Sequence, residues 1–342
     1  SIQSGPAQIG LASRGAVPAN QTILGVVEND LCIACGACVH VCPHDVVAPT
    51  YNDYRGAHEV RISDGSFCAS CPAPCARVCP SVAVDLVELL GEGEASRVGP
   101  LRSVQIGFAA ADQNNGVSSS GGIVRALIRA AVRSGTPVIC LGVAPQPRGY
   151  APFVARTEAD LANIPGSIYH GTSFCECIEL LEAVERPALI VAIPCHLEGL
   201  SKYIQEADPG LADRIALTVG IICGWMYSDH AIQAFSTYKG QGGSFSDARY
   251  RGEDKVGRLK IWNDAGKSTW SRREFADRAE RIDYQASFAR YLNRLRCRLC
   301  EDHLNVLADV AVGDAWLARS VEQKVSVVAV RTERGEGWLA DL

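Results

Sequence analysis

The chain has 342 residues, of which 47% are hydrophobic, and carries a formal net charge of −5 with a pI near 5.8. This length and apolar content are enough for one large core or for two domains, which excludes an intrinsically disordered chain. The mixed, slightly acidic charge argues against nucleic acid or an anionic membrane surface as a partner.

Residues 1–24 are expected to form a loose N-terminal arm, because they lack the basic start and apolar run of a secretory signal. The longest apolar stretch, Ile215 to Tyr227, is about 13 residues long and falls short of the roughly 18 to 20 that cross a bilayer. We therefore expect a cytoplasmic protein without a membrane span. In a reducing compartment, its 15 cysteines indicate metal binding or catalysis rather than disulfide bonds.

Residues 25–90 contain two cysteine motifs that nearly repeat. The first reads CxxCxxCxxxCP, and the second has one more residue between its second and third cysteines. Such spacing is typical of bacterial ferredoxins, in which three cysteines bind one 4Fe–4S cluster and the fourth binds the other. The crossed pattern predicts one cluster on Cys32, Cys35, Cys38 and Cys79, and another on Cys68, Cys71, Cys75 and Cys42. A pair of structural zinc sites is the alternative, although these normally use CxxC pairs held well apart.

From Val104 onward, apolar segments alternate with amphipathic ones. Strands are expected over 136–144, 187–194 and 215–223, and helices over 121–135 and 174–184. Residues 91–342 are thus predicted to form an α/β domain with a largely parallel or mixed sheet, whose loops beyond the strand ends bind cofactors. The fold class expected for the chain is α+β / α/β, a ferredoxin-like two-cluster module followed by an α/β domain.

A serine- and glycine-rich loop precedes the helix expected over 121–135. It comprises Ser118, Ser119, Ser120, Gly121 and Gly122. Free backbone amides and the positive end of the helix dipole would face a phosphate placed there. Ordinary helix capping by serine explains the loop equally well at this point.

Seven motifs in fixed order carry a family resemblance. They are "SSSGGIVRALI", "SIYHGTSF", "IPCHLEGLSKY", "GIICGWMYS", "YRGEDKVGRLKIW", "CRLCEDHLNVLADVAVGD" and "VSVVAVRTERGE". Together they resemble the family formed by the beta subunits of the deazaflavin-coenzyme-reducing hydrogenases and dehydrogenases, which includes 7-hydroxymethyl chlorophyll reductase. The resemblance implies an iron–sulfur flavoprotein with one FAD and a third 4Fe–4S cluster in the α/β domain.

The resemblance also assigns residues. The ligands implied for the third cluster are Cys195, Cys223, Cys297 and Cys300, although four thiolates would also satisfy a tetrahedral zinc ion. The loop 118–122 becomes the FAD-contacting loop, and Tyr250 and Arg251 fall in a stretch near the flavin. His303 stands where relatives have an aromatic residue, and could relay a proton as a catalytic group. A structural histidine is the alternative.

These features predict an FAD-dependent iron–sulfur oxidoreductase. It would pass electrons between ferredoxin-type clusters and FAD, to or from a small organic substrate or coenzyme, and exchange them with a redox protein partner. The alternative is an electron-transfer beta subunit of a larger hydrogenase, dehydrogenase or reductase complex, exchanging hydride with a deazaflavin or nicotinamide coenzyme. A homo-oligomer is compatible with both.

Overall fold

The computed structural model describes residues 22–90, 98–112, 118–144, 149–240, 242, 245–251, 258–263, 266–271, 290–315 and 324–342. Of the expected N-terminal arm, residues 1–21 lie outside this range, and residue 23 already begins a helix. None of the helices in the described ranges combines the length and the apolar character required to cross a membrane.

The N-terminal module is a small unit built around its own cysteines. Its elements are α1 (Ile23–Glu28), α2 (Ala37–His40), β1 (Val47–Asn52), β2 (Ala57–Ile62), η2 (Gly65–Ala69), α3 (Pro74–Val78) and α4 (Leu86–Leu90). Strands β1 and β2 pair antiparallel, and their inner side chains Val47 and Val60 pack against the cysteines. A core this small usually needs an additional stabilising element, such as a metal centre.

The second unit is built on a seven-stranded mixed sheet. Its strand order is β3-β12-β11-β7-β6-β4-β5, with bounds β3 (Ser103–Gly107), β4 (Val138–Val143), β5 (Tyr150–Ala155), β6 (Ala188–Ala192), β7 (Ile215–Ile221), β11 (Val310–Asp314) and β12 (Ser326–Val330). The four central strands β11, β7, β6 and β4 are parallel, while β5, β12 and β3 are antiparallel to their neighbours. The mixed α/β sheet expected from the sequence is confirmed, and β4, β6 and β7 fall within the expected segments.

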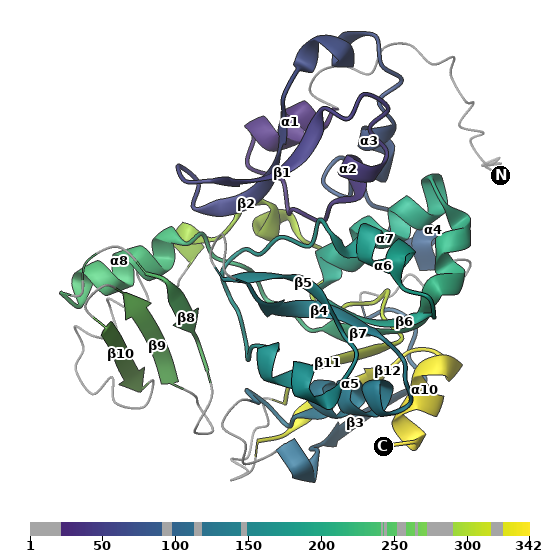
Figure 1. Cartoon of the computed structure of the whole chain (residues 1–342), viewed down its shortest axis with the longest axis vertical. Helices are drawn as coiled ribbons and strands as arrows, with labels where there is room; N and C mark the ends of the chain where they lie inside the picture. Colours follow the sequence, from purple (N-terminus) through teal and green to yellow (C-terminus); the bar gives the residue numbers. More distant parts are fainter. Residues whose placement is uncertain are drawn as a thin grey trace, which may run out of the picture.

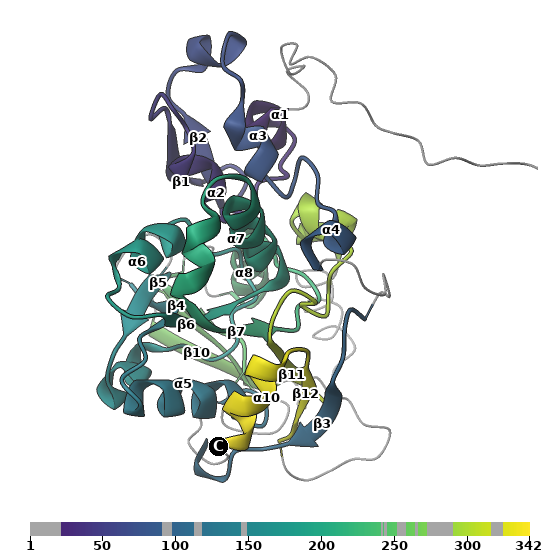
Figure 2. The ribbon, with the colours of Figure 1, turned by 90° about the vertical axis from the view of Figure 1, so that its right-hand side faces the viewer.

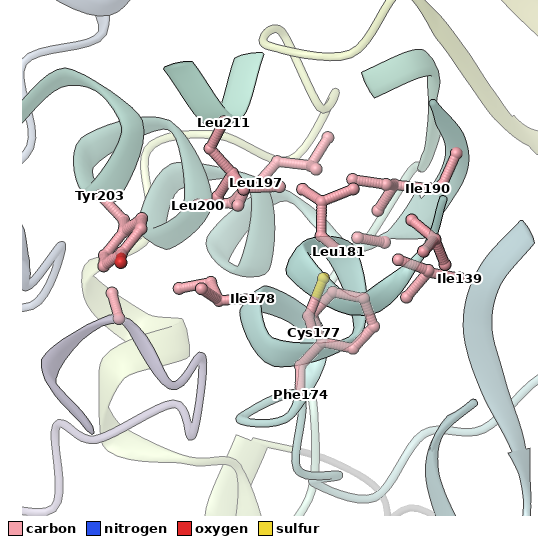
Figure 3. Close-up of a cluster of buried hydrophobic side chains, with 14 of the residues drawn as sticks. Ile139, Phe174, Cys177, Ile178, Leu181, Ile190, Leu197, Leu200, Tyr203 and Leu211 are labelled. Carbon is pink, nitrogen blue, oxygen red and sulfur yellow. The ribbon is translucent and has the colours of Figure 1, made fainter. Parts of the chain in front are cut away.

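Helices cover both faces of this sheet (Figure 1). Helix α5 (Ile123–Arg133) packs on one face together with the C-terminal α10 (Glu333–Ala340). Helices α6 (Cys177–Ala183) and α7 (Pro194–Glu206) pack on the other, where Phe174, Leu197 and Leu200 meet the strand residue Ile190 (Figure 3). The N-terminal module lies on the outer side of this second helix layer, as two perpendicular views show (Figures 1 and 2). The helix layer α6–α7 therefore separates the module from the sheet.

A third, three-stranded sheet stands beside the main one and was not expected from the sequence. It consists of β8 (Asp247–Arg249), β9 (Arg258–Asn263) and β10 (Gly266–Ser271), with β9 in the middle. Helix α8 (His230–Tyr238) covers it through Ile232 and Phe235. Short 3-10 helices complete the described fold: η3 (Ala110–Asp112), η4 (Glu158–Asn163), η5 (Pro209–Arg214), η6 (Arg290–Leu292) and η7 (Leu295–Leu299).

Candidate metal centres and cofactor cavity

Four thiols of the N-terminal module converge from two loops, and we call them site I: Cys32, Cys35, Cys38 and Cys79. Burial raises the pKa of Cys32 to about 11, and the charge of Cys79 contributes to the rise. The pKa of Cys35 is raised well above its usual value by burial first and by Cys79 next. The first loop can wrap around this point because Ala34 and Gly36 take left-handed backbone conformations, with φ of 52° and 86°.

The other four thiols of the module form site II: Cys42, Cys68, Cys71 and Cys75. Burial raises the pKa of Cys75 to about 11, and the charges of Cys42 and Cys71 add to it. The fourth cysteine of each motif thus lies with the first three of the other, which is the crossed grouping that the spacing predicts. Site II lies nearer to solvent than site I, because all four of its cysteines are partly exposed and Phe67 beside Cys68 is 45% exposed.

The sulfur of Cys35 packs directly on helix α7. A Cβ atom on Gly199 would lie 2.6 Å from Cys35 Sγ, so glycine is what allows the sulfur to reach the helix surface. Three residues further along, Lys202 donates a hydrogen bond to the Cys79 carbonyl at 3.4 Å. Cys195 lies four residues before Gly199, which is roughly 6 Å along the helix axis. Site I is therefore about one helical turn from a cysteine of the α/β domain.

Cys195 belongs to a third group of thiols, site III: Cys195, Cys223, Cys297 and Cys300. They come from the first turn of α7, the loop after β7, and η7 with the residue that ends it. Burial raises the pKa of Cys223 to about 12, with Cys297 and Cys300 adding to the rise. All four line one small cavity of about 20 Å³. The fold therefore brings together the four cysteines that the family resemblance implies.

Two arginines just before Cys297 connect the loop of site III to its surroundings. Arg294 donates to the carbonyl of Cys32 at 2.8 Å and to the carboxylate of Asp30 at 2.9 Å. Arg296 donates to the buried carboxylate of Glu198 at 3.2 Å. Burial raises the pKa of Glu198 to about 7, against the effect of Arg296, which lowers it. These bonds fix the position of the loop that carries Cys297 and Cys300.

The donor chemistry of the three sites fits 4Fe–4S clusters. Each site offers four cysteine sulfurs, which is the ligand set of a cubane cluster. Within the described ranges, no group of three or more His, Cys, Asp or Glu side chains is arranged to hold a metal ion. A cubane binds each thiolate through a different iron atom, so its ligands stand farther apart than those around one ion. The remaining cysteines are buried elsewhere: Cys140 in β4, Cys177 in the core of Figure 3, and Cys175 against the loop of site I.

A large cavity of about 300 Å³ opens at the carboxyl ends of the four parallel strands. Residues at or just beyond the ends of three strands line it, including Ile193 after β6, Ile222 after β7 and Asp314 of β11. This is where open α/β sheets bind their ligands. The loop after β7 lines both this cavity and the small cavity of site III through Cys223, Gly224, Trp225 and Met226. Site III and the large cavity are therefore separated by a single loop.

The serine- and glycine-rich loop lies at the wall of the large cavity. Ser118, Ser119, Ser120 and Gly122 line it, and Gly122 takes a left-handed conformation just before α5. The Ser119 hydroxyl accepts a hydrogen bond from the Ser167 amide at 3.0 Å, so it already braces a neighbouring loop. Gly121 has another role, because a Cβ there would lie 2.6 Å from the Gly107 carbonyl and 2.7 Å from the Ser326 amide nitrogen. It allows close packing of the loop on the sheet and is not one of the lining residues.

Three further residues named from the sequence lie at different depths. Arg251 lines the large cavity and pairs with Asp314. Tyr250 is buried behind the wall, where its hydroxyl and His170 Nδ1 are 3.0 Å apart in a hydrogen bond. His303 lines the small cavity of site III and not the large one, and its Nδ1 lies 2.9 Å from the Cys223 carbonyl. The geometry thus places His303 beside the thiols of site III rather than at the large cavity.

Sequence reasoning missed two histidines that line the large cavity and contact aromatic rings. His170 comes from "SIYHGTSF" and contacts Tyr150 and Tyr250. His196 stacks on Phe174, with 4.8 Å between ring centroids and 8° between planes. Its position immediately after Cys195, in "IPCHLEGL", was the available signal.

Comparisons with known proteins match both parts of the chain. Residues 31–83 match the 4Fe–4S dicluster domain family. Residues 186–342 match the family described as the C terminus of the coenzyme F420 hydrogenase/dehydrogenase beta subunit. A curated relative, one of the subunits of the F(420)H(2) dehydrogenase of Methanosarcina mazei, is 26% identical over 208 residues, which make up 59% of this chain and 55% of that protein. The chain therefore matches only about half the length of that relative.

A solved structure shares the fold. It is a chain from the F420-reducing NiFe hydrogenase complex of Methanosarcina barkeri, with a TM-score of 0.53 and 20% sequence identity. The likeness covers 72% of this chain and 81% of that one. It extends across most of both chains and concerns their fold alone.

Proposed function

We propose that this chain, whose residues 186–342 match the C terminus of the coenzyme F420 hydrogenase/dehydrogenase beta subunit and whose residues 31–83 match a 4Fe–4S dicluster domain, is an iron–sulfur flavoprotein. It would transfer electrons as part of a larger redox complex. The dicluster domain accounts for two 4Fe–4S clusters, for which sites I and II supply the eight cysteines. Site III would hold a third cluster, and the large cavity FAD. Bound FAD would join the one-electron chemistry of the clusters to two-electron exchange with a substrate.

One observation carries this proposal: the three cysteine sites and the cavity lie in series. Site II is at the exposed end of the module, and site I contacts α7 through Cys35. Cys195 of site III is in the first turn of the same helix, and the Cys223 loop borders the large cavity. Each site is thus connected to the next by packed protein. Such a series suits electron transfer between a partner at one end and a substrate at the other.

The charge of the module supports a protein partner at the exposed end. Residues 25–90 contain eight acidic and three basic side chains, so they carry a net charge equal to the −5 of the whole chain. A partner with a basic docking surface would be steered toward such a module, and salt would weaken the attraction. We therefore propose that the redox partner binds at site II. Increasing the salt concentration should slow electron exchange with that partner.

On the substrate side, we propose a hydride-exchanging coenzyme of the deazaflavin or nicotinamide type. The relatives named above act within coenzyme F420 dehydrogenase and hydrogenase systems, as their names state. This favours a component of a complex over a stand-alone oxidoreductase. Purification from the native host discriminates between the two, because a component of a complex should bring a stoichiometric partner with it. Turnover by the isolated chain with a ferredoxin as its only partner would support the stand-alone enzyme instead.

The cofactor content tests the proposal directly. Anaerobically purified protein should contain about 12 iron atoms and one FAD per chain, the content of three cubane clusters and one flavin. Cys297→Ala should lower the iron to about 8 atoms and slow reduction of the flavin. The matched control is Cys177→Ala, which removes a buried thiol outside the three sites and should keep all the iron. Unchanged iron in Cys297→Ala would refute the assignment of site III.

A further inference from the structure

His196 presents an unpaired nitrogen at the wall of the large cavity. Its side chain is buried, with the residue only 2% exposed, and it lines the cavity from the first turn of α7. Within the described part of the chain, Nε2 has no hydrogen-bond partner. A buried polar atom without a partner is costly, which suggests that a bound molecule completes its hydrogen bonding.

The hydrogen-bonding role of Nε2 follows from the other ring nitrogen. The imidazole makes a hydrogen bond with the backbone of Ile33, and because Nε2 has no partner, this bond belongs to Nδ1. A backbone carbonyl can only accept, so Nδ1 carries the proton. An imidazole that holds a single proton therefore keeps it on Nδ1, where the carbonyl accepts it. In a neutral imidazole with its proton on Nδ1, Nε2 is a hydrogen-bond acceptor.

The loop of site I holds this arrangement in place. Ile33 lies between Cys32 and Cys35, and so does Ala34, whose carbonyl accepts a hydrogen bond from the Phe174 amide at 2.9 Å. Phe174 in turn stacks on the imidazole. Two consecutive carbonyls of one loop therefore fix the rotation of His196 and the position of the ring beside it. Phe174 is seen next to Cys177 in Figure 3.

We infer that His196 is a positioning residue of the cofactor cavity, whose Nε2 accepts a hydrogen bond from an N–H group of the ring system bound there. This inference rests on the proposed function, which makes that ring the isoalloxazine of FAD. An isoalloxazine has a ring N–H in both its oxidised and its reduced form. The hydrogen bond would orient the ring relative to site III, whose ligand Cys195 is the adjacent residue.

Two substitutions test the inference. His196→Asn keeps a polar atom near the position of Nδ1 and loses the acceptor at Nε2, while His196→Gln places an amide oxygen close to Nε2. Each variant, with its iron content verified, is stripped of flavin and titrated with FAD, and the flavin midpoint potential is then measured. His196→Asn should bind FAD about three- to tenfold more weakly, which is the loss expected for one neutral hydrogen bond. It should also shift the flavin potential and leave the potentials of the clusters unchanged.

His196→Gln should restore the affinity to within about twofold of the wild type, since it again supplies an acceptor. The matched control is His40→Asn, which alters a histidine of the module that bonds the Cys175 carbonyl and should leave FAD binding unchanged. Wild-type affinity and potential in His196→Asn would overturn the inference, and so would equal loss in both His196 variants. If the wild type does not bind FAD at all, the proposed function fails, and the inference fails with it.

Discussion

Gly199 provides the most direct test of how the module and the α/β domain meet. A methyl group on its Cα would lie 2.6 Å from Cys35 Sγ and 2.8 Å from Cys35 Cβ. Both distances are well inside van der Waals contact, so Gly199→Ala must move Cys35 or the helix. Overpacking of this kind costs about 1–3 kcal/mol. For a domain of this size each kcal/mol lowers Tm by roughly 2–4 °C, so a decrease of several degrees is expected.

The same substitution should slow electron transfer, because Cys35 of site I is the sulfur that contacts α7. The assay is anaerobic thermal unfolding together with rapid-mixing reduction of the cofactors, monitored by absorption. Gly337→Ala is the matched control, since Gly337 lies within α10 with no heavy atom inside 4 Å of an added Cβ. That change should be neutral or slightly stabilising. Equal melting temperatures and equal rates for Gly199→Ala and the wild type would refute the reasoning.

Three further predictions follow from the buried groups. Asp309→Asn should lower the free energy of unfolding by about 2–4 kcal/mol and leave the iron and flavin content unchanged. The reason is that Asp309 is only 3% exposed and accepts hydrogen bonds from Thr218 and Arg334. Denaturant unfolding would measure the loss of stability. Cluster reconstitution of the apoprotein should accelerate as pH rises from 7 toward 9. Burial raises the pKa of Cys32 to about 11, so this thiol is protonated at neutral pH. A thiol must lose its proton to bind iron, and a higher pH makes that loss easier. The rate is measured from the growth of cluster absorption, and a rate that does not change with pH would contradict this prediction. Cys35→Ala should weaken FAD binding through the loop that holds His196, whereas Cys71→Ala in site II should not, and flavin titration of both variants would distinguish them.

The sequence predicted the cysteine groups well because their chemistry is local. Three closely spaced thiols and a following Cys-Pro leave few structural solutions, so the crossed grouping of sites I and II could be read from spacing. The sheet was also predictable in its centre, because the buried parallel strands β6 and β7 are continuous apolar runs. The outer strands β3 and β12 were missed, since their pairing depends on partners more than 200 residues apart in the chain.

The cavity wall was harder to predict, because it depends on contacts between distant segments. Tyr250 and His303 belong to the right motifs, yet one lies behind the wall and the other beside site III. Gly121 belongs to the right loop but packs against the backbone of the sheet. A motif identifies which segment is near a site, whereas the direction of each side chain is set by tertiary packing.

The sequence of helix α7 does contain a pattern that indicates how the sites are connected. Leu197, Leu200 and Tyr203 follow helical spacing and face the core of the α/β domain. Cys195, Gly199 and Lys202 are spaced by four and three residues, so they share another face of the helix. That face meets the module, because Gly199 contacts Cys35 and Lys202 bonds the Cys79 carbonyl. A glycine between a cysteine and a lysine on one helix face has no helical advantage of its own, since glycine weakens helices. Gly199 is explained by the close approach of Cys35 Sγ, which a larger residue would block. Helix α7 is therefore the structural connection between the dicluster module and the cofactor cavity.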